Sequence, residues 1–395
     1  MRPPHRRLSV PAAALGIPFA GAAPPPAARS TARVPRTAGF RPELAAAQCA
    51  IAQYPVSVLT TSDLDALIAD TESEMARVIA AAEDERTGAL YDMVRYHMGL
   101  DRQGPRGKRL RPLLGLLAYE SIAGEYQRAL PGAAAVEMGH NFSLVHDDIE
   151  DAGIERRHRA ALWTVTGVPQ AINTGDTLFS LSRMALHRLT ELGFSAEKVL
   201  ALMHLYDTTC LALCEGQFMD IWTSEHDEWM SVEYYFDMIG RKTAALIAGS
   251  VQAGAMLATD DERVVLAYRR FGWALGLAFQ LNDDMLGIWG DEASTGKEPS
   301  DIAARKKTLP LIYAVERGLA ADRDRLSEIL RHEPPTDTEV AEVGAILERS
   351  GARDYTRTRA RAYRDEALAQ LESAGIIDGE AMERLRLIVV SAISA

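Results

Sequence analysis

Cysteine is scarce in this sequence of 395 residues, which contains only Cys49, Cys210 and Cys214. Three cysteines at these positions form neither a disulfide framework nor the ligand spacing of a zinc site. Such low use of cysteine suits a reducing compartment, where disulfides rarely persist. We therefore expect a cytoplasmic protein.

Long apolar runs and an excess of positive charge are also missing. No stretch reaches the 18 or more apolar residues typical of a membrane span, so we expect no span. The 43 Lys and Arg residues are outnumbered by 55 Asp and Glu residues, giving a formal net charge of -12. This balance argues against a nucleic-acid partner. An anionic substrate would have to meet local clusters of basic side chains.

Residues 1 to 42 contain no Asp or Glu and are rich in Ala, Pro and Arg. Such a composition has little means of burying a core and predicts disorder. The apolar stretch from Leu8 to Ala20 is interrupted by Pro11 and Pro18, so a targeting peptide is the less favoured interpretation. We place a disordered tail at residues 1–60 and a single all-α domain at residues 61–395.

From Ser62 onward, apolar residues recur at spacings of three and four, a pattern that predicts helices. We find neither an alternating strand pattern nor the short Val/Ile runs of a parallel sheet. Thr259 with Glu262, and Thr336 with Glu339, each fit a capping box at a helix start. With 47% hydrophobic residues, the chain can bury a large core. These features predict an all-α helical bundle.

A first acidic segment follows the apolar residues that begin at Phe142. On a helix, Asp147, Asp148 and Asp151 stand at positions i, i+1 and i+4, and together form an oxygen-rich patch. Carboxylate oxygens suit Mg²⁺, which commonly bridges to substrate phosphates. The basic pair at 156 and 157 follows directly, and guanidinium groups are well shaped for phosphate oxygens.

A second acidic pair, Asp283 and Asp284, interrupts the otherwise apolar segment 271–289. Burying carboxylates among apolar side chains is unfavourable unless a cation or hydrogen bonds compensate for the lost water. Two acidic helices could share a cation. The sequence therefore predicts a metal site between them.

Several short motifs follow one another along the chain. They are GKRLRP at 107–112, HNFSLVHDDIEDAGIERR at 140–157, GD at 175–176, GQFMD at 216–220, KT at 242–243, FQLNDD at 279–284, and GKEPSD with KKTLP within 296–310. This ordered set resembles the trans-isoprenyl diphosphate synthases of the polyprenyl synthetase family, over roughly residues 65 to 390.

The resemblance implies the isoprenoid synthase fold, a helical bundle around a central apolar cavity. It also implies a prenyltransferase of isoprenoid biosynthesis that acts as a homodimer. The implied reaction is Mg²⁺-dependent head-to-tail condensation of isopentenyl diphosphate with an allylic diphosphate, which yields a short-chain trans-polyprenyl diphosphate.

The resemblance also implies roles for particular residues. Three Mg²⁺ ions per active site would be held by Asp147, Asp148, Asp151, Asp283 and Asp284. Isopentenyl diphosphate would be bound by Lys108, Arg111, His140 and Arg157. The allylic diphosphate would be bound by Arg156, Lys242, Thr243, Gln280, Lys297 and Lys307, with Arg305 and Lys306 as neighbours whose roles the sequence does not separate. Asp220, Asp291 and Asp301 would orient lysines and metal-bound waters.

Product length is expected to depend on Phe142 and Ser143, which precede the first acidic motif. By resemblance, an aromatic residue five positions before Asp147 forms a floor for the growing chain, and Ser143 is too small to reinforce it. Since the motif also lacks a two-residue insertion, the pattern is similar to that of synthases making the twenty-carbon geranylgeranyl diphosphate. Farnesyl diphosphate is the alternative product.

The chain departs from the family pattern in two places. Gly287 stands where the second motif usually ends in a third Asp, which puts metal affinity or the exact reaction in doubt. In the loop after the arginines, His158 replaces a frequent Gly and Ala160 a frequent Pro.

Parts of the sequence are also compatible with three other functions. A class I terpene cyclase would need no second substrate, whereas Lys108, Arg111 and His140 provide for one. A non-catalytic regulatory subunit would be expected to lose the first acidic motif, which is intact. The third is a ferritin-like di-iron protein, because Glu137 and His140 form an E-x-x-H pair, but the chain has no second such pair on another helix.

Overall fold

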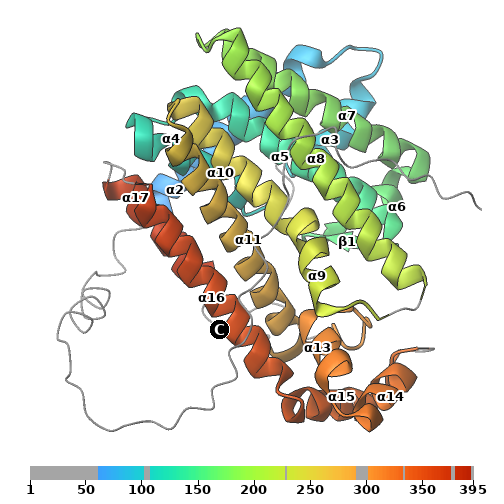
Figure 1. The fold of residues 1–395 in the computed structure, drawn as a ribbon. Helices are drawn as coiled ribbons and strands as arrows, with labels where there is room; N and C mark the ends of the chain where they lie inside the picture. The colour runs from blue at the N-terminus through green and yellow to red at the C-terminus, as the bar shows by residue number, and fades with distance from the viewer. Residues whose placement is uncertain are drawn as a thin grey trace, which may run out of the picture. The chain divides into compact units, whose positions relative to one another are not determined.

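The computed structural model describes residues 61–101, 107–226, 229–290, 301–331, 334–374 and 379–392, so the tail predicted for residues 1–60 lies outside it. The described part is almost entirely helical (Figure 1), which confirms the predicted all-α class. Its α-helices are α2 (Thr61–Ala82), α3 (Gly88–Met98), α4 (Leu110–Ala123), α5 (Leu130–Glu150), α6 (Leu162–Thr166), α7 (Val168–His187), α8 (Ala196–Glu225), α9 (Val232–Ile239), α10 (Ala245–Ala258), α11 (Glu262–Trp289), α13 (Leu309–Arg317), α14 (Ala320–Ile329), α15 (Asp337–Arg349), α16 (Ala352–Ser373) and α17 (Gly379–Ala392). Short 3₁₀ turns occupy Gln127–Ala129 and Arg188–Thr190.

Side-chain caps begin several of these helices. The predicted capping box of Thr336 and Glu339 is confirmed at the start of α15. The one predicted for Thr259 and Glu262 is wrong, because Thr259 ends α10 and Asp261 caps α11 by accepting a hydrogen bond from the main-chain N–H of Arg263. Asp261 lies two positions closer to α11 than Thr259, and it caps the unpaired N–H groups at the start of that helix.

A small β-hairpin follows α5, although the sequence pattern predicted no strand. Strands β1 (Glu155–Arg156) and β2 (Arg159–Ala160) pair antiparallel, with Arg156 opposite Arg159. The two turn residues, Arg157 and His158, have φ angles of 54° and 57°. Two successive residues with positive φ make the tight turn that suits a hairpin. Glycine is favoured at such positions, and a side chain there carries some backbone strain.

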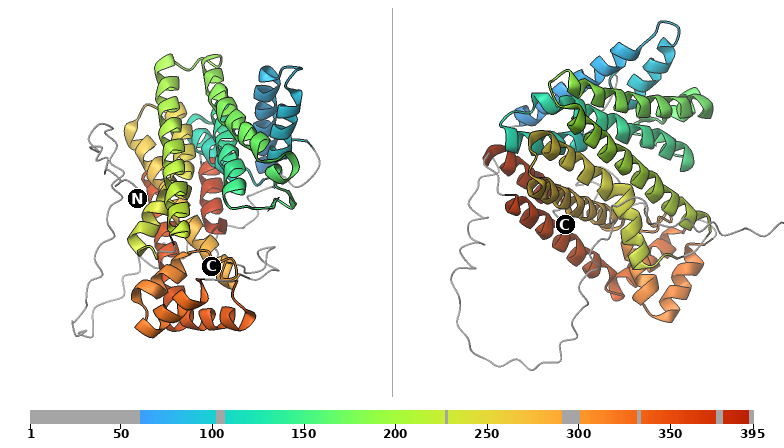
Figure 2. Two further views of the ribbon diagram at one scale, coloured as in Figure 1. Left: turned by 90° about the vertical axis from the view of Figure 1, so that its right-hand side faces the viewer. Right: turned by 45° about the horizontal axis from the view of Figure 1, so that its top comes forward.

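The core is built mainly around α5, α10 and α11. Residues 131–139 of α5 and 245–251 of α10 are buried without exception. Helix α16 packs along α11 (Figure 1). A second, smaller apolar cluster joins the end of α11 to α13, α14 and α15, which gather at one end of the longer helices (Figure 2).

A π-helical turn at Gly240–Ala244 links α9 to α10. Single π turns inside helices are uncommon and frequently mark functional sites. This one contains the Lys242-Thr243 motif. Helix α8 approaches it closely, because a Cβ atom at Gly216 would lie 2.3 Å from the main-chain nitrogen of Lys242. The glycine of the GQFMD motif therefore brings α8 against the π turn.

None of the helices in the described ranges combines the length and the apolar character needed to cross a bilayer. Cys210 and Cys214 are both free thiols.

Candidate active site

The first acidic segment lies at the carboxyl end of α5. Asp148 is buried, and both of its oxygens accept hydrogen bonds from Nε of Arg156, at 2.8 and 2.9 Å. Asp147 is more open and accepts from Gln217 at 3.1 Å and from Arg156 at 3.3 Å. Asp151 is the exposed C-cap residue of the helix. The three carboxylates therefore have different environments, with Asp148 held by its arginine and the other two closer to solvent.

The second acidic pair, on α11, is divided in the same way. Asp283 is exposed. Asp284 is buried and accepts hydrogen bonds from the Tyr235 hydroxyl, from the Gln280 amide at 3.1 Å and from the main-chain N–H of Leu309 at 2.9 Å. Despite these donors, burial raises the pKa of Asp284 to about 6. Asp284 thus fixes the start of α13 to α11, and the carboxylate of Asp283 is left exposed to solvent.

Asp220 on α8 connects the two acidic helix ends electrostatically. Its carboxylate lies 2.5 Å from Nζ of Lys242, and that ammonium is 3.9 Å from Asp147. Burial opposes the charge on Lys242, but Asp220 and Asp147 raise its pKa. Burial and then Asp147 raise the pKa of Asp151, with a smaller contribution from Asp220. Burial opposes the charge on Lys306, but nearby carboxylates, led by Asp284, raise its pKa, and Asp220 again contributes least. The acidic ends of α5 and α11 therefore share one electrostatic environment.

The two adjacent lysines before α13 make different contacts. Nζ of Lys306 lies 3.9 Å from Asp283 and 3.7 Å from Asp301. Lys307 instead donates to the main-chain oxygen of Thr223 at 2.6 Å and lies 6.0 Å from the Trp229 ring centre. Sequence reasoning named Lys307 and left the role of Lys306 open. The sequence carries no signal to choose between them, because both are lysines and the turn decides their directions.

The remaining predicted allylic-site residues meet around the π turn. The Thr243 hydroxyl donates to Gln280 at 2.8 Å, and Gln280 in turn donates to Asp284. Lys242 and Thr243 are thus joined to both acidic helices. Lys297 lies outside the described residues.

Four basic residues predicted to bind isopentenyl diphosphate lie near the start of α4 and the middle of α5. Arg111 lies 3.1 Å from the His140 ring nitrogen. Arg157 donates to Asn141 at 3.2 Å and packs against Gly107, next to the exposed Lys108. Burial, followed by the charges of Arg111 and Arg157, holds the pKa of His140 well below its usual value. The His140 ring therefore lies beside the Arg111 guanidinium in a positive field.

Arg109, between Lys108 and Leu110, has a structural role. Its buried side chain pairs with Glu72 at 3.2 Å and with Glu137 at 2.8 Å, and so joins α2 to α5. Glu137 also accepts from Asn141 at 3.0 Å. Because Glu137 is already paired with these groups, the geometry gives no support to the di-iron alternative.

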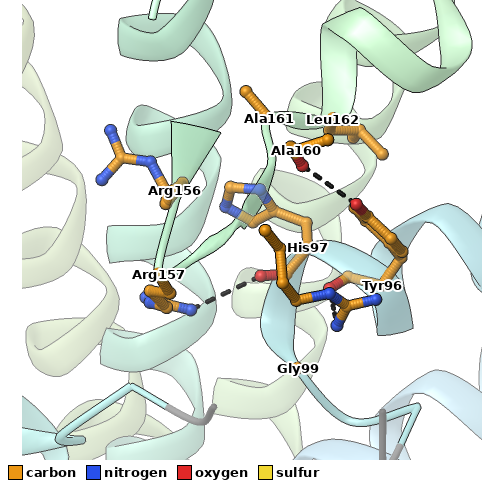
Figure 3. Close-up of a pocket in the computed structure, with 9 residues that line it drawn as sticks. Tyr96, His97, Gly99, Arg156, Arg157, Ala160, Ala161 and Leu162 are labelled. Atoms are coloured by element: carbon orange, nitrogen blue, oxygen red, sulfur yellow. Dashed lines mark hydrogen bonds between the residues drawn. The ribbon is translucent and has the colours of Figure 1, made fainter. Parts of the chain in front are cut away.

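A small cleft opens beside this basic group, lined by the hairpin and the end of α3 (Figure 3). His97, Arg156, Arg157 and Arg159 line it. The Arg157 guanidinium reaches the His97 main-chain oxygen at 3.4 Å. Burial and the two arginines at 156 and 157 lower the pKa of His97 to about 3. The cleft therefore adds to a strongly positive region.

Within the described ranges, no three His, Cys, Asp or Glu side chains converge closely enough to cage a metal ion. The carboxylates nevertheless suit a hard cation. Burial, and then repulsion from Asp147, raises the pKa of Asp151 to about 6. One buried oxygen of Asp301 has no hydrogen-bond partner among the described residues. A cation would relieve both, and an open set of carboxylates fits Mg²⁺ that completes its shell with water and phosphate oxygens.

Phe142, the predicted floor residue, is buried on α5. Its ring packs edge-on against Phe179 of α7, with centroids 5.1 Å apart, and Phe179 stacks on Tyr206 of α8. The Ser143 hydroxyl donates to the main-chain oxygen of His140 at 2.8 Å. Three aromatic rings from three helices therefore stand behind the first acidic segment.

Acidic ends on two helices, separate basic groups for anions and a helical bundle together define an enzyme of the isoprenoid synthase fold. The polyprenyl synthetase family model matches residues 89–347, and the chain belongs to that family. It is accordingly a prenyltransferase, with the activity of a short-chain trans-prenyl diphosphate synthase.

Known relatives agree on the family and differ in product. A short chain isoprenyl diphosphate synthase of Methanothermobacter thermautotrophicus is 38% identical over 71% of this chain and 84% of its own length. A (2E,6E)-farnesyl diphosphate synthase of Mycobacterium bovis is 36% identical over 74% and 82%. The crystal structure of geranylgeranyl pyrophosphate synthetase from Pyrococcus horikoshii has a TM-score of 0.76 and 29% identity, covering 85% of this chain and 98% of that one.

The two lysines before α13 give a direct test of the geometry. We expect Lys306→Ala to lower turnover by roughly a hundredfold, because it removes a charge beside Asp283 where a leaving group would be stabilised. Lys307→Ala, the matched control, should change turnover by less than about threefold. Steady-state rates of the two purified variants would decide this, and equal losses would contradict the assignment of Lys306.

Proposed function

We propose that this protein condenses isopentenyl diphosphate with an allylic diphosphate in the presence of Mg²⁺, and that its main product is geranylgeranyl diphosphate. The observation that carries the proposal is the arrangement of two distinct groups. The acidic ends of α5 and α11, with Lys242 and Lys306, suit one diphosphate. The half-buried Arg111–His140 pair with Arg157 suits a second.

Asp147, Asp151 and Asp283 would hold the Mg²⁺ ions, because their carboxylates are the open ones. Bound there, the ions would neutralise the charge that develops on the allylic diphosphate as it leaves. Asp148 and Asp284, which the sequence also suggested as ligands, direct their oxygens to protein donors. Their role in this proposal is to hold Arg156 and the start of α13 in place.

The chain's own cations act at the same point in the reaction. Lys242 and Lys306 place fixed positive charge where the leaving group gains negative charge. The C–O bond of the allylic substrate breaks, the resulting cation is attacked by the double bond of isopentenyl diphosphate, and a proton is lost. The departing diphosphate is the proposed base for that proton. Buried aromatic and apolar side chains keep water from the cation.

Incubation with Mg²⁺, isopentenyl diphosphate and each allylic starter in turn, followed by chromatography of the products, tests this function. We expect elongation that requires both substrates. Asp147→Ala should lower the rate by at least roughly a hundredfold, since it removes a ligand used as charge builds on the leaving group, while the melting temperature stays within a few degrees.

The alternatives predict other outcomes. A hydrocarbon made from the allylic substrate alone would identify a terpene cyclase. An absence of product with every starter would favour a regulatory subunit. Farnesyl diphosphate as the end product would contradict the twenty-carbon assignment only.

Product length gives a second test, centred on Phe142. On a helix this residue lies about 7.5 Å before Asp147 along the axis, and its ring closes against Phe179. Phe142→Ala should lengthen the main product, because the floor moves back toward Phe179. Phe271→Ala, another buried phenylalanine, is the control and should lower stability without changing the product. If Phe142→Ala only costs stability, about 3 to 5 kcal/mol for a buried phenylalanine, the residue is simply part of the core.

We further propose that the enzyme is a homodimer. Helix α8 carries Leu200, Leu211, Phe218 and Trp222, all of them large, apolar and exposed. Their spacings of 11, 7 and 4 place them on one face of the helix. Such a continuous apolar face on a surface helix suits a protein partner.

Leu211→Glu should shift sedimentation toward the monomer at micromolar concentration, because it puts a charge into the centre of this face. Leu319→Glu, at an exposed apolar residue beside α14, is the control and should leave the assembly unchanged. A wild-type protein that sediments only as a monomer would disprove the dimer.

A further inference from the structure

We propose that the ion pair between Arg159 and Asp101 sets the affinity for isopentenyl diphosphate, although neither side chain is among the residues assigned to that substrate. Arg159 acts as a positioning residue, which holds the strained turn of the hairpin and, through that turn, the guanidinium group of Arg157. This inference rests on the proposed function, because it concerns how one of the two diphosphate sites is kept in shape.

The turn that carries Arg157 is strained and needs support. Arg157 and His158 have φ angles of 54° and 57°, a region that glycine adopts freely and that is unfavourable for other residues. The hydrogen bonds of the Arg157 side chain are long, at 3.4 Å to the His97 main-chain oxygen and 3.2 Å to Asn141. Bonds of this length give limited support. The turn therefore depends on the two strands that flank it.

Strand β1 is anchored to α5. The buried carboxylate of Asp148 accepts hydrogen bonds from Nε of Arg156 at 2.8 and 2.9 Å, and charged hydrogen bonds of this length are strong. In the hairpin, Arg156 is paired with Arg159 of β2. Two like charges directly opposite each other repel. Strand β2 therefore needs a carboxylate of its own.

Asp101, which follows α3, provides that carboxylate. Arg159 donates two parallel hydrogen bonds to it, at 3.0 and 2.7 Å, a fork geometry that fixes both groups. The side chains are 16% and 25% exposed, so solvent screens this pair less than a fully exposed one. The Arg159 guanidinium lies 3.9 Å from the Tyr96 ring centre, and the Tyr96 hydroxyl donates to the Ala160 main-chain oxygen at 2.9 Å (Figure 3). The end of α3 thus holds β2.

The two anchors support the two substrate arginines unequally. Arg156 is held directly by Asp148, whether or not β2 keeps its place. Arg157 lies in the turn between the two anchored strands. Without the Arg159 pair, the strained turn can relax and carry the Arg157 guanidinium away from the basic group around His140. The pair therefore matters for the site that contains Arg157 and much less for the site that contains Arg156.

Calorimetric titration of the purified protein tests this separation, with isopentenyl diphosphate alone as one probe and geranyl diphosphate with Mg²⁺ as the other. Arg159→Gln should raise the Kd for isopentenyl diphosphate by roughly tenfold and that for geranyl diphosphate by less than about twofold, since only the first involves the interaction network of the turn. Arg325→Gln is the matched control, because Arg325 makes an equivalent two-point pair with Glu342 between α14 and α15. It should leave both Kd values unchanged.

Two double variants separate positioning from direct binding. Asp101→Asn should weaken isopentenyl diphosphate as much as Arg159→Gln does, and the two changes together should add little, because both break the same pair. His158→Gly should restore most of the affinity lost in Arg159→Gln, since glycine takes a positive φ without strain. If Arg159 instead contacted the substrate, Asp101→Asn would leave binding intact or make it stronger, and His158→Gly would restore nothing.

Melting temperatures within a few degrees of the wild type would show that the variants lose binding and not the fold. Should Arg159→Gln unfold, the isosteric Asp101→Asn carries the same test. Normal binding by the single variants, equal weakening of both diphosphates, or additive losses in the Arg159→Gln/Asp101→Asn variant would overturn the inference while the proposed function stands. A wild type that neither binds isopentenyl diphosphate nor elongates an allylic starter would disprove the proposed function, and the inference with it.

Discussion

Each acidic helix end buries one carboxylate and leaves its neighbour open, and the rest of the site depends on this division. Asp148 is buried against Arg156, and Asp284 is buried beneath Tyr235, Gln280 and the start of α13. A buried carboxylate is tolerated only when hydrogen bonds or charges replace its water. Meeting that requirement ties the hairpin to α5 and α13 to α11. It leaves the carboxylates of Asp147 and Asp283 open, which is why we propose them as metal ligands.

The carboxylates of the site repel one another, and two lysines lie among them. Lys242 contacts Asp220 and approaches Asp147, and Lys306 lies between Asp283 and Asp301. These ion pairs offset part of the repulsion among the carboxylates. In the proposed function, the same ammonium groups donate hydrogen bonds to a bound diphosphate, so one set of charges serves two purposes.

Backbone strain helps to place one of the arginines of the basic region. Arg157 and His158 take positive φ angles that glycine would adopt more easily, and residues in this region carry a cost of order 1 kcal/mol each. The tight turn directs Arg157 toward Asn141 and Gly107. The strained turn therefore holds the Arg157 guanidinium in the basic region that also contains Arg111 and His140. Without such a constraint, repulsion would separate the positive charges of Arg157 and Arg111.

The sequence by itself determined the helical class, the capping box at Thr336 and the family, because periodicity, local caps and ordered motifs are properties of short segments. It also named the residue types of the site. It could not decide between Asp147 and Asp148, between Asp283 and Asp284, or between Lys306 and Lys307. Neighbouring aspartates are chemically identical in sequence, but on a helix they point about 100° apart, so only the packing of other helices determines which is buried. For the two lysines, the turn before α13 decides their directions.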